Sequence, residues 1–339
     1  MELPSPAQIR REHPLSSPRL VSSWRCEAAD ILQRKDRRLV AIMGPCSIHD
    51  PKAAIEYAKR LKSLKEERGD DFFFIMRLFI EKPRTKLGWK GMLYDPRLDG
   101  SNDICDGLWS SRELMVKITE MGIPCAMEIL EPIALPYFDD LLVWALVGAR
   151  TSASQPHRQA ASGLPFPVGF KNDCQGKLDG AIAGIATSRI SHTHMGINSA
   201  GHVATIQTEG NPLSHLVLRG SDTGYNYDPD SIGEALFALR EQGLQEQLVI
   251  DCSHGNCGKD YQRQQIAFAS VIEQAATNRA IAGIMLESHL LSGKQPLGND
   301  PSLLSYGISI TDPCLSWEET EDLFTCNLHN LHSPWGRPP

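Results

Sequence analysis

Four side chains from distant parts of the sequence are of types that bind divalent transition metals. They are one cysteine, one histidine and two acidic residues: Cys46, His254, Glu287 and Asp312. Mixed sulfur, nitrogen and oxygen ligands suit a divalent ion such as Mn, Fe, Co or Zn acting as a Lewis acid, and its charge would hold Cys46 as a thiolate. No compact zinc-finger spacing joins these positions, so four unrelated structural or solvated side chains remain the alternative interpretation.

Six basic residues form a second set: Arg77, Lys82, Arg84, Arg150, Lys171 and Arg219. A solvated surface position is the ordinary interpretation of each one taken singly. Like charges that converge repel one another unless an anion lies between them. Phosphates and carboxylates suit that place, because each charge-assisted hydrogen bond to them is worth roughly 1.5 to 3 kcal/mol. The second set therefore indicates a site for a phosphorylated or carboxylated small molecule.

Short apolar runs are the elements that must position both sets. There are eight runs, each ending in or just before a residue able to bind an anion or a metal: 39–43, 72–76, 125–127, 146–149, 167–170, 216–218, 248–250 and 281–286. Amphipathic helical patterns separate them, for example after Asp50 and Pro51 and over residues 110–122. Eight strands alternating with helices predict an α/β fold, a closed (β/α)8 TIM barrel. Its strand ends gather at one face, where a single site could use them all.

Three segments break this alternation. Residues 1–38 are a Pro- and Ser-rich N-terminal extension in which we expect one short helix near 24–32. Residues 191–208 have period-two character with internal glycines, which predicts an inserted β-hairpin outside the barrel. Residues 327–339 are rich in Pro and Gly, and we expect a flexible C-terminal tail there. The predicted catalytic barrel therefore spans residues 39–326.

Composition and charge argue against several classes of partner. The 339 residues carry a net charge of -7, which counts against nucleic acid, because phosphate-backbone binding needs a basic surface. No apolar run reaches the roughly 18 residues that a membrane span needs, and the polar, Pro-interrupted start is not a secretory signal. Nine cysteines without paired spacings do not indicate a disulfide framework. We therefore expect a reduced cytoplasmic protein that does not bind membranes.

Several short motifs together resemble one enzyme family. They are GPCSIHD at 44–50, EKPRT at 81–85, GWKG at 88–91, GART at 148–151, PVGFKN at 167–172, LRG at 218–220, SH at 253–254 and ESH at 287–289. In these motifs the chain resembles 3-deoxy-D-arabino-heptulosonate 7-phosphate (DAHP) synthase of class I, the type common in enteric bacteria. The resemblance is collinear over about residues 4–324 and supports the barrel prediction.

The resemblance implies a metal-dependent, aldol-like condensation of phosphoenolpyruvate with erythrose 4-phosphate, the first step of the shikimate pathway. The product is DAHP, and inorganic phosphate is released. Position by position, it implies that the metal ligands are Cys46, His254, Glu287 and Asp312, and that phosphoenolpyruvate is held by Arg77, Arg150, Lys171 and Arg219. We also expect a homo-oligomer, either a dimer or a tetramer.

The same resemblance assigns the remaining site residues. Lys82 matches a residue between both substrates, and Glu128 matches an acidic residue beside the phosphoenolpyruvate pocket. Arg84 and Thr85 match the binders of erythrose phosphate. Lys82 could protonate the developing alkoxide and Glu128 could orient the water that captures the intermediate. Together with His254, these two are the expected catalytic residues.

Several positions depart from the family pattern. Asp173 and Ser221 stand where glycines are usual, and the hairpin run at 198–202 lacks the usual lysine. In the family an aromatic amino acid binds near this hairpin, beside a loop here at 162–165 and an N-terminal arm of a neighbouring subunit. This chain begins late relative to that arm, and Pro165 replaces a common serine, which removes a backbone donor and a hydroxyl. We expect weak or absent inhibition by phenylalanine, tyrosine or tryptophan.

Three alternative functions remain open from sequence. The first is 3-deoxy-D-manno-octulosonate 8-phosphate synthase, which uses arabinose 5-phosphate, although the KPRT motif at 82–85 argues against it. The second is a Schiff-base aldolase with Lys171 as nucleophile. The third is a non-catalytic paralogue that keeps the fold. No glycine pattern supports a dinucleotide cofactor.

Overall fold

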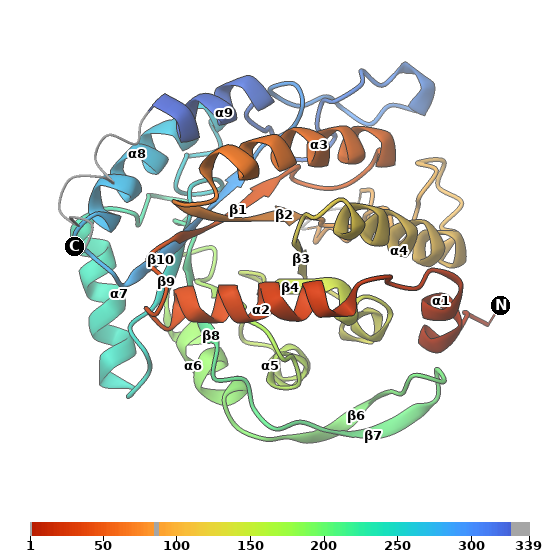
Figure 1. The fold of residues 1–339 in the computed structure, drawn as a ribbon, viewed down its shortest axis with the longest axis horizontal. Coiled ribbons are helices and arrows are strands. Elements are labelled where there is room, and N and C mark those ends of the chain that lie inside the picture. Colours follow the sequence, from red (N-terminus) through yellow and green to blue (C-terminus); the bar gives the residue numbers. More distant parts are fainter. Residues whose placement is uncertain (1, 85–87, 327–339) are drawn as a thin grey trace.

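Eight parallel strands close into a barrel in the computed structural model, which describes residues 2–84 and 88–326 (Figure 1). The strands are β1 (Leu39–Gly44), β2 (Phe72–Arg77), β3 (Cys125–Glu128), β4 (Leu142–Val147), β5 (Val168–Lys171), β8 (Ser214–Leu218), β9 (Leu248–Asp251) and β10 (Ile281–Glu287). Around the barrel their order is β1-β10-β9-β8-β5-β4-β3-β2, so the first and last strands are neighbours. The predicted (β/α)8 architecture is confirmed.

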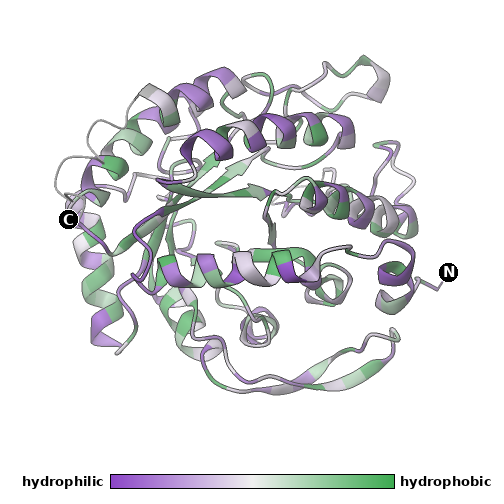
Figure 2. Ribbon diagram, viewed as in Figure 1, coloured by the Kyte–Doolittle hydropathy of each residue, from purple (hydrophilic) through white to green (hydrophobic). Residues whose placement is uncertain are grey.

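Burial on both faces explains why the strands appear in the sequence as continuous apolar runs. Every residue of β1, β2, β4 and β10 is buried. Figure 2 shows hydrophobic colouring along the strands and mixed colouring along the surrounding helices. Such runs are typical of parallel strands covered by helices. The run predicted at 146–149 marks only the end of β4, which begins at Leu142.

Helices cover the outside of the barrel between successive strands. They are α3 (Pro51–Arg68), α4 (Ile104–Glu120), α5 (Gln155–Ser162), α6 (Asp179–Ser188), α7 (Pro229–Glu241), α8 (Gln264–Ala275) and α9 (Trp317–Cys326), with 3-10 turns η1 (Pro132–Tyr137), η2 (Asp139–Leu141), η3 (Tyr261–Arg263) and η4 (Pro301–Leu303). Helix α3 begins where predicted, because the Asp50 side chain accepts hydrogen bonds from the backbone N–H groups of Lys52 and Ala53. Helix α4 begins at Ile104 rather than near residue 110, because Asp103 caps it through the N–H of Asp106.

The N-terminal extension contains two helices, so the helix predicted near 24–32 is present but begins earlier, and the prediction of a single helix was wrong. They are α1 (Pro6–Glu12) and α2 (Pro18–Leu32), and each has a serine followed by proline at its start. Proline at the first helical position is pre-organised for the helix, and this signal moves the start of α2 to Pro18. The buried face of α2, which includes Val21 and Trp24, packs on the apolar interior of the barrel. The extension therefore belongs to the folded core.

The inserted hairpin consists of β6 (Thr193–Ile197) and β7 (Val203–Gln207), which pair antiparallel outside the barrel (Figure 1). Its tip contacts the N-terminal extension, because the Ala7 N–H donates to the Ser199 carbonyl at 2.8 Å. Thr208, just past β7, shares a hydrogen bond of 2.7 Å with the hydroxyl of Ser162. The tail expected at 327–339 lies outside the described residues. In the described parts of the chain no helix is long and apolar enough to cross a bilayer.

Arg112 is predicted to be essential for stability, because it joins three segments at a buried point. Its guanidinium is 1% exposed, contacts both Asp140 carboxylate oxygens at 2.8 Å, and donates to the backbone carbonyls of His13 and Tyr137. Arg112→Met leaves these acceptors without a donor, so we expect a loss of about 3 to 5 kcal/mol in the free energy of unfolding. Urea denaturation followed by circular dichroism measures this change.

The matched control for Arg112→Met is Arg240→Met. Arg240 forms an ion pair with Glu246 of similar length, 2.7 Å, but its side chain is 63% exposed. Exposed ion pairs contribute little, so this variant should unfold at the same urea concentration as the original chain. Equal losses in the two variants would contradict the buried anchoring role of Arg112.

Candidate active site at the carboxyl ends of the strands

The carboxyl ends of the barrel strands carry most of the predicted site residues. The last residues of β2, β3, β5 and β10 are Arg77, Glu128, Lys171 and Glu287. Arg219 directly follows β8, and Cys46 lies two residues after β1. Because parallel strands all end at the same face of a barrel, these side chains are brought together from across the chain. Arg150 is exposed in the turn after β4, and Thr85 lies outside the described residues.

Three of the four predicted metal ligands form a compact group. The donor atoms of Cys46, Glu287 and Asp312 all lie within 4.8 Å of one another. Cys46 and Glu287 are buried, whereas Asp312 is exposed. His254 lies beside the group, with its Nε2 atom 3.7 Å from Glu287 Oε1. One thiol, two carboxylates and an adjacent imidazole are a donor set that a borderline divalent metal accepts, so the residues fit such an ion.

Lys82 places a positive charge among these acidic groups. Its Nζ lies 2.6 Å from Cys46 Sγ and 3.4 Å from Asp312 Oδ2. Burial alone would raise the pKa of Asp312, but Lys82 and His254 hold that pKa below its usual range. Burial, together with the nearby Glu287 carboxylate, raises the pKa of the Cys46 thiol well above its usual value despite Lys82. Cys46 therefore needs a further cation to become a thiolate near neutral pH.

Two buried arginines hold donors that could bind an anion. Arg77 is 1% exposed, and its Nη2 donates to Glu287 Oε1 at 3.0 Å. Its Nε and Nη1 atoms, and Nη1 of Arg219, are buried without a hydrogen-bond partner among the described residues. An unpaired buried donor is costly, so each such group favours a ligand that accepts hydrogen bonds. These donors are suited to a phosphate or a carboxylate.

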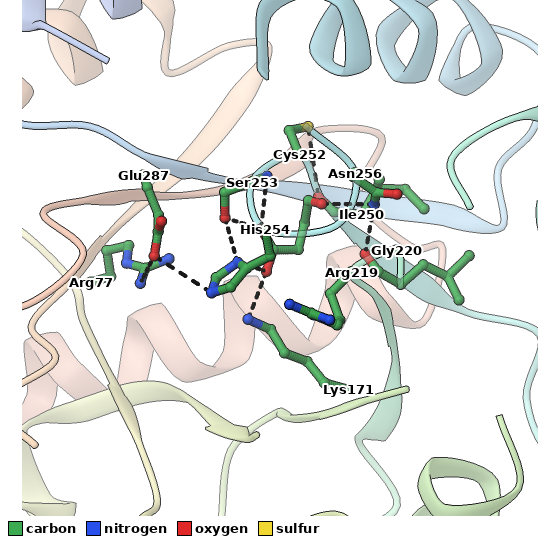
Figure 3. A network of polar contacts seen from close by, with 12 residues as sticks. Arg77, Lys171, Arg219, Gly220, Ile250, Cys252, Ser253, His254, Asn256 and Glu287 are labelled. Atoms are coloured by element: carbon green, nitrogen blue, oxygen red, sulfur yellow. Dashed lines mark hydrogen bonds and ion pairs between the residues drawn. The ribbon is translucent and has the colours of Figure 1, made fainter. Parts of the chain in front are cut away.

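A buried carboxylate, Asp251, joins one of the basic residues to one of the predicted metal ligands. It ends β9 and is fully buried, and its Oδ2 lies 2.6 Å from Lys171 Nζ and 3.0 Å from His254 Nδ1. Burial would raise its pKa, but Lys171 and His254 keep the pKa of Asp251 well below the usual value. Figure 3 shows the side chains of Lys171, Arg219 and His254 converging from the end of β5, the residue after β8 and the loop after β9. The sequence placed Asp251 at a strand end without assigning it a role.

The loop after β9 is held in an unusual backbone conformation. His254 has a φ of 57°, in the left-handed region that non-glycine residues rarely adopt. The neighbouring loop after β8 approaches closely, because a Cβ added to Gly220 would lie 2.4 Å from the Asn256 nitrogen. Asn256 in turn donates to the Asp251 carbonyl at 2.8 Å. The tight packing of the two loops therefore fixes the position of the imidazole.

A second pair of carboxylates lies on the β2–β3 side of the site. Glu81 is 1% exposed and receives a hydrogen bond from Tyr94 Oη at 3.3 Å. Burial raises the pKa of Glu81 to about 8, with Glu128 contributing. Glu128 approaches the backbone so closely that a Cβ added to Gly148 would lie 2.2 Å from its Oε1. Glu81 is the first residue of the EKPRT motif, and no local pattern in the sequence marks it as a buried acid.

A cavity of about 480 Å³ is lined by Thr311, the residue before Asp312. Its wall also includes Arg84, Trp89 and Lys294. Lys294 was missed by sequence reasoning, because no apolar run or quoted motif ends at it. Two cations on one cavity of this size suit a small phosphorylated molecule.

Comparisons with known proteins agree with this geometry. The DAHP synthetase I family profile matches residues 12–325. The chain is 44% identical over 333 residues to "Phospho-2-dehydro-3-deoxyheptonate aldolase, Tyr-sensitive" of Escherichia coli (strain K12), covering 97% of this chain and 92% of that protein. It is 43% identical over 321 residues to the Trp-sensitive enzyme of Enterobacter agglomerans, covering 94% and 91%.

The similarity extends to tertiary structure. The solved structure of the phospho-2-dehydro-3-deoxyheptonate aldolase from Francisella tularensis SCHU S4 superposes with a TM-score of 0.94 at 38% sequence identity, covering 98% of each chain. The strand order, the site at the strand ends and these matches along nearly the full length have one explanation: the chain belongs to the DAHP synthetase I family.

Proposed function

We propose that this chain is a DAHP synthase that condenses phosphoenolpyruvate with erythrose 4-phosphate at the carboxyl ends of its barrel strands. The observation that supports this most strongly is the convergence of Cys46, Glu287 and Asp312 beside buried cationic donors. Members of this family are typically metal-dependent. The identity of the ion, among Mn, Fe, Co and Zn, is not distinguished by such ligands. We propose that Cys46, His254, Glu287 and Asp312 hold it.

Binding of phosphoenolpyruvate is assigned to the basic residues. Arg77 and Arg219 offer buried N–H groups, and Lys171 supplies a charged ammonium from the end of β5. Arg150 would complete the set. Several fixed cations hold the substrate anion at attack distance and stabilise the phosphate as it leaves, an effect that can supply several kcal/mol.

Carbon–carbon bond formation needs a polarised aldehyde, because the enol ether of phosphoenolpyruvate is a modest nucleophile. A divalent metal bound at the site supplies Lewis-acid polarisation of that carbonyl. Lys82 lies beside Cys46 and Asp312, which supports its role as the proton donor to the oxygen that becomes an alkoxide. Water captures the resulting cationic carbon, and Glu128 orients this water. Loss of inorganic phosphate then completes the reaction.

The cavity with Trp89 in its wall is proposed to hold the phosphate end of the sugar. Arg84 and Lys294 line it from two different loops, and Thr311, which also lines it, directly precedes the proposed ligand Asp312. Thr85 is assigned to the same phosphate on the family resemblance alone.

The alternative functions are weakened by particular features. A Schiff-base mechanism needs a neutral Lys171, but its Nζ is 2.6 Å from the buried Asp251 carboxylate, which stabilises the charged form. A non-catalytic role is opposed by the presence of every proposed ligand. The octulosonate synthase is opposed by the match of the DAHP synthetase I family profile over residues 12–325, and the choice of sugar tests it directly.

We further propose a homo-oligomer, a dimer or a tetramer, in the cytoplasm. Met195 and Val203 on the hairpin are 84% and 80% exposed, which suits contact with another copy. The eight cysteines whose side chains the structure describes are free thiols, as in a reducing compartment.

The proposed reaction predicts the loss of enolpyruvate absorbance when purified protein meets both substrates. Erythrose 4-phosphate should be consumed with formation of DAHP, whereas arabinose 5-phosphate should react at least about tenfold more slowly. EDTA should abolish turnover and a divalent metal should restore it, because the aldehyde is no longer polarised without the ion. Preference for arabinose 5-phosphate would favour the octulosonate synthase. Trapping of Lys171 by borohydride, with full activity in EDTA, would favour the Schiff-base aldolase.

Metal affinity is predicted to rise with pH through Cys46. Its thiol is protonated near neutral pH and must lose that proton to bind a metal, so affinity should increase about tenfold per pH unit between about pH 7 and 8.5. Competition with a chromophoric chelator measures this slope. Cys46→Ser should bind more weakly with a nearly flat slope, whereas Cys125→Ser, a buried cysteine outside the group, should behave as the original chain. An unchanged slope in Cys46→Ser would remove Cys46 from the ligand set.

Weak feedback inhibition is the remaining functional prediction. Pro165 lies in the loop after Ser162, whose hydroxyl bonds to Thr208 at the base of the hairpin. Proline there offers neither an N–H nor a hydroxyl to an amino-acid ligand. We expect turnover to stay near its full rate in micromolar phenylalanine, tyrosine or tryptophan. Complete inhibition by any one of them would contradict this prediction, and Pro165→Ser tests whether the missing donors are the cause.

A further inference from the structure

Asp251 has an unusual position, because one fully buried carboxylate serves two different sets of residues. Its Oδ2 lies 2.6 Å from Lys171 Nζ and 3.0 Å from His254 Nδ1. Its Oδ1 accepts hydrogen bonds from the Ser253 hydroxyl at 2.5 Å and the Ser253 N–H at 3.0 Å. Lys171 belongs to the proposed phosphoenolpyruvate site and His254 to the proposed metal site.

The contacts of the imidazole determine which of its nitrogens carries the proton. Nδ1 faces the Asp251 carboxylate, which can only accept, and lies 2.6 Å from the Ser253 hydroxyl. Because that hydroxyl already donates its one proton to Asp251, it can only accept a hydrogen bond from Nδ1. Nδ1 is therefore the protonated nitrogen, and Nε2 keeps its lone pair on the side facing Glu287. A metal needs this form of the ring.

The contact with Lys171 is equally specific. The ammonium is 5% exposed and comes from β5, whereas Asp251 comes from β9, so the pair spans two strands that are not neighbours in the barrel. The carboxylate neutralises a buried cation and holds it at the end of β5, beside Arg219 (Figure 3). An anion that binds Lys171 must share it with this carboxylate.

We propose that Asp251 is a positioning residue that couples binding of the metal to binding of phosphoenolpyruvate. This inference rests on the proposed function. When an anion takes up part of the Lys171 charge, less of the Asp251 charge is neutralised, and the carboxylate acts more strongly on the protonated Nδ1 of His254 at 3.0 Å. The Nε2 atom then becomes a better electron donor. Linkage is reciprocal, so the metal strengthens phosphoenolpyruvate binding by the same factor. The chain thus favours loading of both ligands together.

The test compares metal affinity with and without phosphoenolpyruvate, using Co²⁺ or Zn²⁺ and a competing chelator in the absence of turnover. In the original chain, saturating phosphoenolpyruvate should tighten metal binding about fivefold or more. In Asp251→Asn the metal should bind roughly 10- to 100-fold more weakly, and phosphoenolpyruvate should no longer change that affinity. Calorimetric titration of phosphoenolpyruvate with and without metal gives the reciprocal factor.

Two control variants separate positioning from general damage. Asp140→Asn removes the partner of Arg112 at a position just before β4, and it should leave both affinities and their coupling unchanged even if it lowers stability. Lys171→Met should weaken phosphoenolpyruvate binding and tighten metal binding in its absence, because Asp251 is then no longer shared between Lys171 and His254. Metal binding by Asp251→Asn with the original affinity, or with the coupling factor retained, would overturn the proposal.

A measurement on the unsubstituted protein keeps the proposal testable if Asp251→Asn does not fold. Nitrogen-15 NMR of the histidine rings in the metal-free protein should show His254 protonated at Nδ1, with the signal assigned by its absence in His254→Gln. Protonation at Nε2 instead would overturn the proposal. Failure of the proposed function can be distinguished from failure of this proposal, because the coupling and the tautomer can be observed even if no DAHP is formed.

Discussion

Pairing of opposite charges at the carboxyl ends of the strands is the interaction on which this site depends. Arg77 pairs with Glu287, Lys171 with Asp251, and Lys82 with Asp312 and the Cys46 thiol. Isolated buried charges carry a large desolvation penalty, so each of these side chains can be buried here only beside a partner of opposite charge. These pairs leave some N–H groups of Arg77 and Arg219 without a hydrogen-bond partner among the described residues. Those N–H groups are suited to bind a substrate anion.

The barrel makes this pairing possible because it fixes backbone positions that come from distant parts of the sequence. Glu287 lies opposite Gly44 in the β1–β10 register, which brings it close to Cys46, although the two residues are more than half the chain apart. The close backbone approach at Gly220 leaves no room for a Cβ, so the loops after β8 and β9 are packed against each other. Such packing holds charged side chains in place without reorganisation.

The segments outside the alternation of strands and helices also support the barrel. Helix α2 packs its apolar face on the barrel interior, and Arg112 ties the segment before it to the turns that precede β4. The hairpin contacts both helix α1 and the end of helix α5. The N-terminal extension, the hairpin and the barrel are thus connected by direct contacts. The candidate site lies at the carboxyl ends of the strands, away from these contacts.

The sequence by itself determined the class of fold and most of the chemistry. Apolar runs followed by Cys46, Arg77, Lys171 and Glu287 were sufficient to predict a barrel with its polar residues at one face, because strand burial and helical periodicity are local signals. The starts of helices α2 and α4, at Pro18 and Ile104, were predicted too late, since capping by serine or aspartate depends on one or two residues and competes with other local patterns.

Only the tertiary structure decided that Asp251 joins Lys171 to His254 and that Glu81 is buried beside Glu128. It also decided that Lys294 shares a cavity with Arg84. Those contacts unite residues far apart in the chain, and their energies depend on distances and burial that no spacing in a sequence specifies.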